Sequence, residues 1–448
     1  MKSLSYFISI LLAGFLFACQ DNMNLGHDSG SFSSINSISI DNGAKVAILS
    51  DIHVMAPSLL VKDGPAFQAY LAQDPKLLEY SAQILDVTIN KLINQRPDLV
   101  LISGDLTKDG EIISHELVAS MLRKLTLNGI KVLVTVGNHD INNPEAVRYI
   151  NDKTVRVPTV QTDKIPNIYA KFGFDNAISN DPNSLSYVNE PIKGLWVITI
   201  DANKYYENTT KSTVSGVIKD ETMAWVKARL AEARQKGKTV IGMMHHNLIE
   251  HYTGETVIDP GYVVDNSDEA ANELMDAGLK IIFTGHYHAN DITKRENADK
   301  SKFIFDVETG STLTYPCTYR MLTINGNEYT FTSQTTTNRM PPVMGMSFDA
   351  YAKAFLAGHL DGYFYYILNT LKGVPAQYAL TFAPWFRDGI MAHYAGDEAP
   401  TADLATQIAT LNAVDPSGQL SGILGTFWTD INTPDNTVTL NMQTGAAY

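Results

Sequence analysis

The chain has 448 residues, 44% of them hydrophobic, and a formal net charge of −14 at pH 7. This length and composition are those of a globular protein with room for more than one domain, and they exclude an intrinsically disordered chain. The negative charge argues against a nucleic-acid polymer as partner, because phosphate backbones are held by an excess of Lys and Arg.

The first 20 residues predict export. Lys2 precedes an apolar run that is too short for a transmembrane helix and is typical of a signal peptide. Leu16-Phe17-Ala18-Cys19 resembles a bacterial lipobox, in which the cysteine is lipidated and becomes the mature N-terminus. We expect a signal peptide over 1–18, a tether over 19–42, and an extracytoplasmic lipoprotein, facing the periplasm or the cell surface and anchored to the membrane through Cys19. An ordinary secretory signal is the alternative.

From residue 44 onward, short apolar runs alternate with helical patterns, which predicts an α/β domain over 43–336. Each apolar run ends in a small polar cluster, and ligands of α/β domains gather at the carboxyl ends of the strands. The runs are KVAILS, DLVLIS, IKVLVTV, LWVITI, TVIGMM and LKIIFT. Residues 54–76 and 141–193 break the alternation, and we expect long loops there that contribute to function.

The C-terminal third differs in pattern. RMLTINGNEYTFTSQ predicts a hairpin around Asn325-Gly326, and TTTNRMPPVMG, residues 335–345, resembles a boundary. Amphipathic patterns over 347–373 and 401–414 predict helices, with Ser347 as an N-cap, and NTVTLNM predicts a final strand. We expect a smaller, mostly helical domain over 343–448 that packs on the first domain as a cap.

The polar clusters at the predicted strand ends hold six of the 11 histidines. Imidazole and carboxylate together are the ligands of first-row transition metals. Two carboxylates, four histidines and one amide oxygen are too many for one ion, so we expect two ions about 3.5–4 Å apart, bridged by Asp105. The clusters contain Asp51, His53, Asp105, Asn138, His139, Asp140, His245, His246, His286 and His288.

The ordered set Asp-x-His, Gly-Asp, Gly-Asn-His-Asp, His-His and Gly-His-x-His resembles the calcineurin-like metallophosphoesterase family over about residues 44–332. The resemblance implies a four-layer α/β/β/α sandwich with a dinuclear site. It implies that Asp51, His53 and His288 bind the first metal, that Asp105 bridges, and that the second metal is bound by Asn138, His245 and His286.

The same resemblance makes His139 a histidine that does not bind metal and instead acts as general acid on the leaving group, with Asp140 orienting it. His246 is expected to lie behind the ligands without a direct role, and Asp201 to be structural. The two ions are divalent Mn, Fe, Zn or Co, because His, Asp and Asn suit all of them.

The sequence departs from the motifs of three subfamilies, and these departures narrow the choice of subfamily. Purple acid phosphatases have a tyrosine ligand where this chain has Lys108. The sequences GDLTKDG and GNHD differ from the motifs of the protein Ser/Thr phosphatases, and Asn247-Leu248 follows the His-His pair where many phosphodiesterases have Pro-Pro. The sequence therefore predicts a phosphodiesterase of small-molecule or lipid phosphoesters that uses a metal-activated hydroxide. The alternatives are a phosphomonoesterase and a non-catalytic phosphoester-binding surface lipoprotein.

Overall fold

The computed structural model describes residues 43–448 except 397, 430 and 432. The predicted signal peptide, the tether and Cys19 lie outside these residues. Within the described part of the chain, no helix has both the length and the apolar character needed to cross a membrane.

The first sheet has six strands, and its centre is parallel: β1 pairs with β3, and β3 pairs with β4. β3 is buried along its whole length, which explains its continuous apolar sequence LVLIS. In spatial order the strands are β16 (Thr437–Asn441), β15 (Glu328–Thr335), β14 (Thr318–Asn325), β1 (Ala44–Leu49), β3 (Leu99–Ser103) and β4 (Lys131–Thr135).

The second sheet has seven strands, and its central strands β9, β10, β11 and β13 are parallel neighbours. Their carboxyl ends lie at one edge of the sheet, as in the first sheet. In spatial order the strands are β12 (Ile292–Glu296), β13 (Phe303–Glu308), β11 (Ile281–Thr284), β10 (Thr239–Met244), β9 (Leu195–Ile200), β8 (Tyr187–Ile192) and β7 (Ser179–Asn180).

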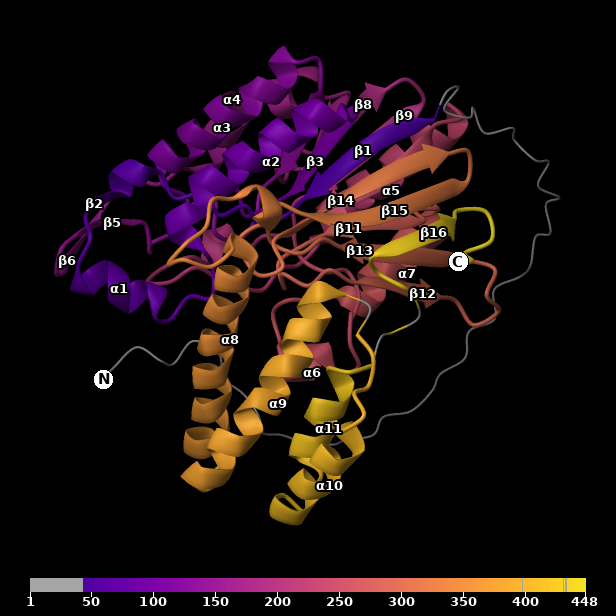
Figure 1. Ribbon diagram of the computed structural model, residues 1–448. Helices are drawn as coiled ribbons and strands as arrows, with labels where there is room; N and C mark the ends of the chain where they lie inside the picture. Colours follow the sequence, from indigo (N-terminus) through magenta and orange to yellow (C-terminus); the bar gives the residue numbers. More distant parts are fainter. Residues whose placement is uncertain (1–42, 397, 430, 432) are drawn as a thin grey trace.

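The two sheets pack face to face around one apolar core that includes Ile48, Leu101, Ile241 and Phe283. Helices α2 (Ser81–Gln95) and α3 (Ile112–Leu127) cover the outer face of the first sheet, because their apolar stripes pack against its outward side chains. Helices α5 (Asp220–Gln235) and α7 (Ser267–Ala277) cover the second sheet in the same way (Figure 1). The predicted four-layer sandwich is confirmed.

The two long segments that were expected as loops contain short helices and strands and pair with each other. β2 (Leu60–Lys62) lies parallel to β5 (Val147–Ile150), which pairs with β6 (Lys153–Arg156) in a small third sheet. The same segments carry α1 (Pro65–Leu71) and α4 (Ile165–Ile168). The rings of Phe67 and Tyr149 lie 4.9 Å apart between them, so the two insertions form one lobe.

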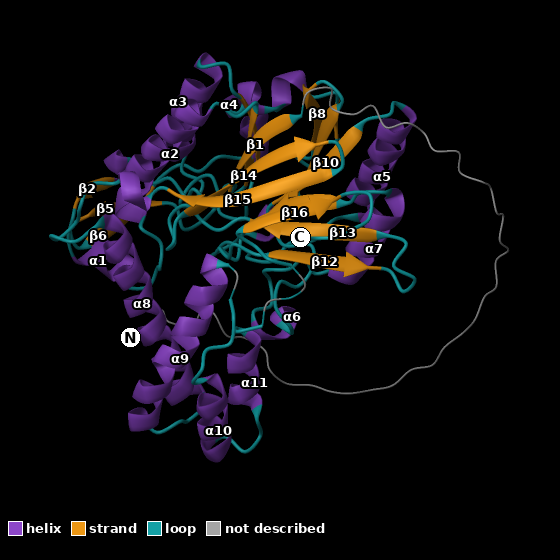
Figure 2. Cartoon of the chain, turned by 45° about the vertical axis from the view of Figure 1, so that its right-hand side comes forward, coloured by secondary structure: helices purple, strands orange, loops and turns teal. Residues whose placement is uncertain are grey.

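The C-terminal region forms a helical lobe below the sheets (Figure 2). Ser347 caps the first helix as predicted, because its hydroxyl accepts from the Ala350 amide. The apolar cluster of this lobe includes Tyr252 and Tyr287 of the first domain, so the lobe packs on that domain. The helices are α8 (Phe348–Tyr366), α9 (Ala376–Ala395), α10 (Leu404–Val414) and α11 (Gln419–Thr426), and the short α6 (Glu255–Ile258) lies beside them in Figure 1.

The last strand does not stay with these helices. β16 returns to the first sheet and pairs with β15, where Val438 and Leu440 join the core between the sheets. The predicted final strand therefore belongs to the sandwich and not to the helical lobe.

Candidate metal centre

The polar clusters that follow β1, β3, β4, β10 and β11 meet at one end of the sandwich, because the carboxyl ends of the parallel strands lie together there. The seven residues that the resemblance identified as ligands make two groups joined at Asp105. All but His288 are classed as buried, and the side chain of His288 is 13% exposed.

The first group is Asp51, His53 and His288. Asp51 Oδ1 lies 3.6 Å from His53 Nε2 and 3.3 Å from His288 Nε2. The two imidazole nitrogens are 3.2 Å apart. The other carboxylate oxygen, Oδ2, accepts from the Ser50 hydroxyl and the His286 amide, whereas Oδ1 is buried and has no hydrogen-bond partner.

Asp105 joins the two groups through one oxygen. Its Oδ1 accepts from the His139 amide at 3.0 Å. Its Oδ2 lies 3.6 Å from His53 Nε2 on one side and 3.4 Å from His245 Nε2 on the other. The bridging position predicted for Asp105 corresponds to this placement between the ligand groups.

The second group is His245, Asn138 and His286. His245 Nδ1 donates to the Ser103 carbonyl at 2.8 Å, so its Nε2 faces Asn138 Oδ1, at 3.1 Å, and the shared carboxylate. A ligand atom of His286 lies within 4.8 Å of one on Asp105 and one on His245. Atoms with lone pairs thus converge in both groups, and a cation is the species that satisfies such a donor set.

Charge states in the centre fit this interpretation. Burial holds the pKa of His53 and His286 well below the ordinary value, so both imidazoles are neutral and able to bind a metal. Burial also opposes the charged form of His245, but Asp105 outweighs it and raises the pKa of His245 to about 9. A divalent ion bound at Asp105 and His245 would displace that proton. The residues present fit two metal ions.

Backbone geometry explains why the motifs carry glycine. A Cβ at Gly137 would overlap Asp105 Oδ1, and a Cβ at Gly285 would overlap Ser50 Oγ. Five of the predicted ligands adopt positive φ, a strained conformation for residues other than glycine, and such strain gathers at functional sites. These residues are Asp51, His53, Asp105, His286 and His288.

His139 lies beside both groups and is 23% exposed at its side chain. Its ring is 5.0 Å from the His53 ring. Nδ1 donates to the Lys108 carbonyl at 2.7 Å and lies 3.0 Å from Asp109 Oδ1. Because Nδ1 is held by these oxygens, Nε2 is the ring nitrogen available to a substrate.

The prediction that Asp140 orients His139 is wrong. The carboxylate of Asp140 accepts from the amides of Leu106, Thr107 and Gly137 and from the Thr107 hydroxyl, and it holds the loop after β3 against the turn after β4. Asp109 is the carboxylate that contacts the imidazole. The sequence contained Asp109 within GDLTKDG, but nothing in its spacing linked it to His139.

The protonation of His139 follows from these contacts. Burial opposes the charged imidazole, but Asp105 and then Asp109 favour it, and together they raise the pKa of His139 to about 9. The pKa of Asp109 is lowered to about 2, because burial is outweighed by Lys108 and by the hydrogen bond from His139. These contacts favour the imidazolium form of His139, which is the form that a proton donor needs.

Two lysines near the centre are paired with carboxylates. Lys108, which occupies the position of the tyrosine ligand of purple acid phosphatases, is fully buried, forms an ion pair with Asp109 and lies 3.6 Å from Glu111. Lys76 lies 3.3 Å from Asp74, and its charge disfavours the protonated forms of His53 and His139, adding to burial at both and partly offsetting Asp105 at His139. Sequence reasoning missed Lys76, which comes from the first insertion.

The remaining predicted residues lie around the centre. His246 Nε2 donates to the Val214 carbonyl at 2.8 Å, and the His246 ring lies 4.4 Å from the His286 ring, so it packs behind a ligand. Asp201 accepts from the Leu185 amide and the Tyr205 hydroxyl. Tyr287 donates to Asp259 at 2.8 Å, away from the metal ligands.

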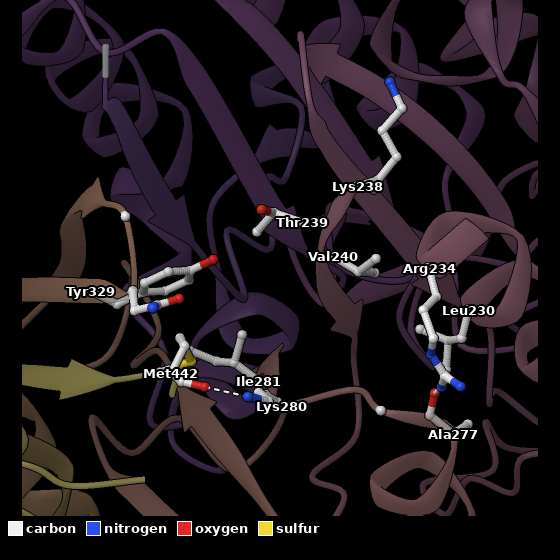
Figure 3. A pocket seen from close by; sticks show the side chains of 13 residues that line it. Leu230, Arg234, Lys238, Thr239, Val240, Ala277, Lys280, Ile281, Tyr329 and Met442 are labelled. Atoms are coloured by element: carbon white, nitrogen blue, oxygen red, sulfur yellow. Dashed lines mark hydrogen bonds between the residues drawn. The ribbon is translucent and has the colours of Figure 1, made fainter. Parts of the chain in front are cut away.

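A cavity of about 330 Å³ lies at the opposite ends of β10 and β11 (Figure 3). Its basic groups are already engaged: Lys280 donates to the Met442 carbonyl, Arg234 donates to the Ala277 carbonyl, and Lys238 pairs with Glu190. This cavity does not contain the predicted site residues.

Two curated proteins are similar to this chain in sequence. The human serine/threonine-protein phosphatase CPPED1 is 26% identical over 236 residues, which are 51% of this chain and 63% of the relative. A "Probable cyclic nucleotide phosphodiesterase" of Ruthia magnifica subsp. Calyptogena magnifica is 49% identical over 55 residues, 12% of this chain and 22% of the relative. The chain thus spans less than two thirds of each of these curated relatives.

Among solved structures, a dimetal phosphatase from Danio rerio aligns with 65% of this chain and 96% of its own, at 12% identity and a TM-score of 0.45. The family model for calcineurin-like phosphoesterases matches residues 44–290, which contain all the predicted ligands and His139. With a match over more than half of its length, the chain belongs to the calcineurin-like phosphoesterase family.

Proposed function

We propose that this protein is a dinuclear metal-dependent phosphodiesterase with His139 as its general acid. The observation that carries the proposal is the position of one Asp105 oxygen between two sets of ligands, beside an accessible imidazolium. Asp51, His53 and His288 would hold one ion, Asn138, His245 and His286 the other, and Asp105 both.

Two divalent ions in this site would supply Lewis acidity toward a phosphoryl oxygen and would lower the pKa of a bound water. The chain itself supplies the proton that the leaving group needs. His139 Nε2 gives it to the leaving oxygen, while Nδ1 stays fixed by the Lys108 carbonyl and Asp109. Before this transfer Asp109 stabilises the imidazolium, and it thereby disfavours loss of the His139 proton when no substrate is bound.

The charges around the centre favour a diester over a monoester. A phosphomonoester dianion carries more charge than a diester and gains more from a free cationic side chain. Lys108 is paired with Asp109 and Lys76 with Asp74, and this pairing weakens the electrostatic attraction of the two lysines for a dianion. The relative named as a probable cyclic nucleotide phosphodiesterase is consistent with this choice.

The test compares two chromogenic esters after removal and return of metal. Protein stripped with a chelator and reconstituted with Mn²⁺ should turn over bis(p-nitrophenyl) phosphate faster than p-nitrophenyl phosphate. Asp105→Asn should lower both the metal content and the activity, because one carboxylate serves both ligand sets. A variant with unchanged metal content would contradict the bridging role.

The opposite order of the two esters would indicate a phosphomonoesterase and would agree with the name of the human relative, a serine/threonine-protein phosphatase. Failure to turn over either ester, or any of a panel of cyclic nucleotides, glycerophosphodiesters and phospholipids, would favour the non-catalytic phosphoester-binding lipoprotein.

We also propose that the protein is anchored outside the cytoplasm through Cys19, on the evidence of the lipobox-like sequence alone. Cys19→Ser should abolish incorporation of a labelled fatty acid in a bacterial host. Labelling that survives the substitution would contradict the anchor, and an unlabelled but secreted wild type would indicate an ordinary signal peptide.

A further inference from the structure

A second group of metal-binding side chains lies between the C-terminal lobe and the loop that carries His286 and His288. Asp291 comes three residues after His288, directly before β12. His393 is in the last turn of α9, and Glu398 follows five residues later. Two parts of the chain that are distant in sequence therefore meet at this group.

The three side chains are fully buried and close enough to share one ion. His393 Nδ1 lies 2.8 Å from Glu398 Oε1 and 3.8 Å from Asp291 Oδ2, and all three side chains are 0% exposed. Ligands bound at about 2.1 Å in tetrahedral or octahedral geometry lie about 3.0–3.4 Å from one another. One ligand atom from each residue lies within 4.8 Å of the others, so small side-chain movements would bring them to a single ion.

The group leaves polar atoms unsatisfied. Asp291 Oδ2, Glu398 Oε2 and His393 Nε2 are buried without a hydrogen-bond partner. A buried carboxylate oxygen without a partner costs free energy, so native proteins nearly always satisfy it. The single Nδ1 proton of His393 can serve only one of two carboxylates, and its partner is Glu398.

The surroundings hold further buried ionisable groups of both signs. The other oxygen of Asp291, Oδ1, lies 2.6 Å from His251 Nδ1, so this contact leaves Oδ2 directed toward His393. Glu308 and Glu255 are also buried close enough to interact with His393, and burial raises the pKa of both carboxyl groups. Because His251 supplies a positive charge here, it is the unpartnered oxygens of Asp291 and Glu398, rather than the net charge, that favour a bound cation.

We propose that Asp291, His393 and Glu398 bind a third divalent transition-metal ion, which fastens the C-terminal lobe to the active-site loop. One imidazole and two carboxylates are a donor set for Zn²⁺, Mn²⁺ or Fe²⁺ rather than for Ca²⁺, which prefers oxygen alone. Because Asp291 is the last residue of the β11–β12 loop, three residues after His288, the ion would also limit the movement of His288.

The test is the metal content of full-length protein, reconstituted with Zn²⁺, freed of loosely bound ions and measured by inductively coupled plasma mass spectrometry. Glu398→Gln keeps the size of the side chain and removes its charge, and it should lower the content by about one ion per chain. Glu269→Gln, at an exposed position in the first turn of α7, is the matched control and should bind as much as wild type.

Thermal unfolding gives a second measurement that is independent of catalysis. In a variant with an impaired catalytic centre, Asp51→Asn/Asp105→Asn/His245→Gln, added Zn²⁺ should still raise the Tm by several degrees. Adding Glu398→Gln to that variant should abolish the rise in Tm. If the protein with Glu398→Gln does not fold, His393→Gln takes its place and should likewise abolish the rise.

Equal metal content in wild type and Glu398→Gln, or a rise in Tm that survives Glu398→Gln, would overturn the proposal. The group would then be an imidazolium held by two carboxylates. Because the result is a difference between variants that share the same catalytic centre, it does not depend on whether that centre binds two ions or is active.

Discussion

At the scale of single residues, the absence of a side chain at Gly137 matters as much as the ligands themselves. Asp105 occupies the space that a Cβ at position 137 would need, and its Oδ2 faces both ligand groups. The turn after β4 can therefore approach the shared carboxylate only where the chain has glycine.

We predict that Gly137→Ala reduces metal content and activity together, because the added methyl group displaces Asp105. The measurement is metal analysis alongside turnover of bis(p-nitrophenyl) phosphate. Gly326→Ala is the control for the added methyl group, since a Cβ there meets nothing within 4 Å, although Gly326, unlike Gly137, has a positive φ. If Gly137→Ala kept its full metal content, the close packing would not be what fixes Asp105.

Asp109 sets the proton affinity of His139. Two divalent ions held by Asp105 would cancel its effect on the imidazolium, and Asp109 would be the carboxylate that remains in contact with the ring. A general acid acts only while protonated, so activity falls as the pH rises through its pKa.

We predict that Asp109→Asn lowers the pKa of His139 and moves the alkaline limb of the pH–rate profile to lower pH by about one unit or more. Asn at 109 also leaves Lys108 with Glu111 as its remaining carboxylate neighbour, so metal content and circular dichroism must be shown to match wild type. An alkaline limb that does not move would mean that Asp109 serves only to neutralise Lys108.

At the scale of elements, the site depends on the carboxyl ends of parallel strands. The apolar runs were recognisable in the sequence because strands buried on both faces are apolar throughout, and the polar residues that end them were therefore visible as well. For this reason the ligand groups around Asp51, Asp105 and His245 could be predicted without coordinates.

Contacts between distant segments could not be predicted in this way. Asp140 follows His139 in sequence, yet at the turn the two side chains point to different partners, and Asp109 reaches the imidazole instead. The pairing of β2 with β5 and the contact between Asp291 and His393 were unpredictable for the same reason. No local sequence pattern indicates which distant segments meet in space.

The C-terminal region is tied to the sandwich by β16 as well as by its helices. Leu440 is fully buried on this strand and packs in the core between the two sheets. Its neighbour in register is Tyr329 of β15.

We predict that Leu440→Ala destabilises the whole protein by about 2–5 kcal/mol, the usual cost of such a truncation in a core. Urea unfolding followed by fluorescence should show one transition at lower urea. Two transitions, of which only the second matches wild type, would indicate that the C-terminal region folds as an independent domain.

At the scale of the whole molecule, an acidic chain of net charge −14 is proposed to act on an anionic substrate. The metal ions would resolve this conflict, because they concentrate positive charge in a small site whose ligands are mostly neutral imidazoles. We expect the two insertions and the helical lobe to determine which phosphoester is selected.

The most direct test of this account is the effect of His139→Ala on two diesters that differ only in leaving group. An alkoxide needs a proton to leave, whereas a nitrophenolate barely does. The account predicts a loss of roughly 10²–10⁴-fold in kcat on an alkyl phosphodiester and a clearly smaller loss on the nitrophenyl ester, with metal content near wild type. An equal loss on both esters, or a loss of metal, would contradict the role of His139 as general acid.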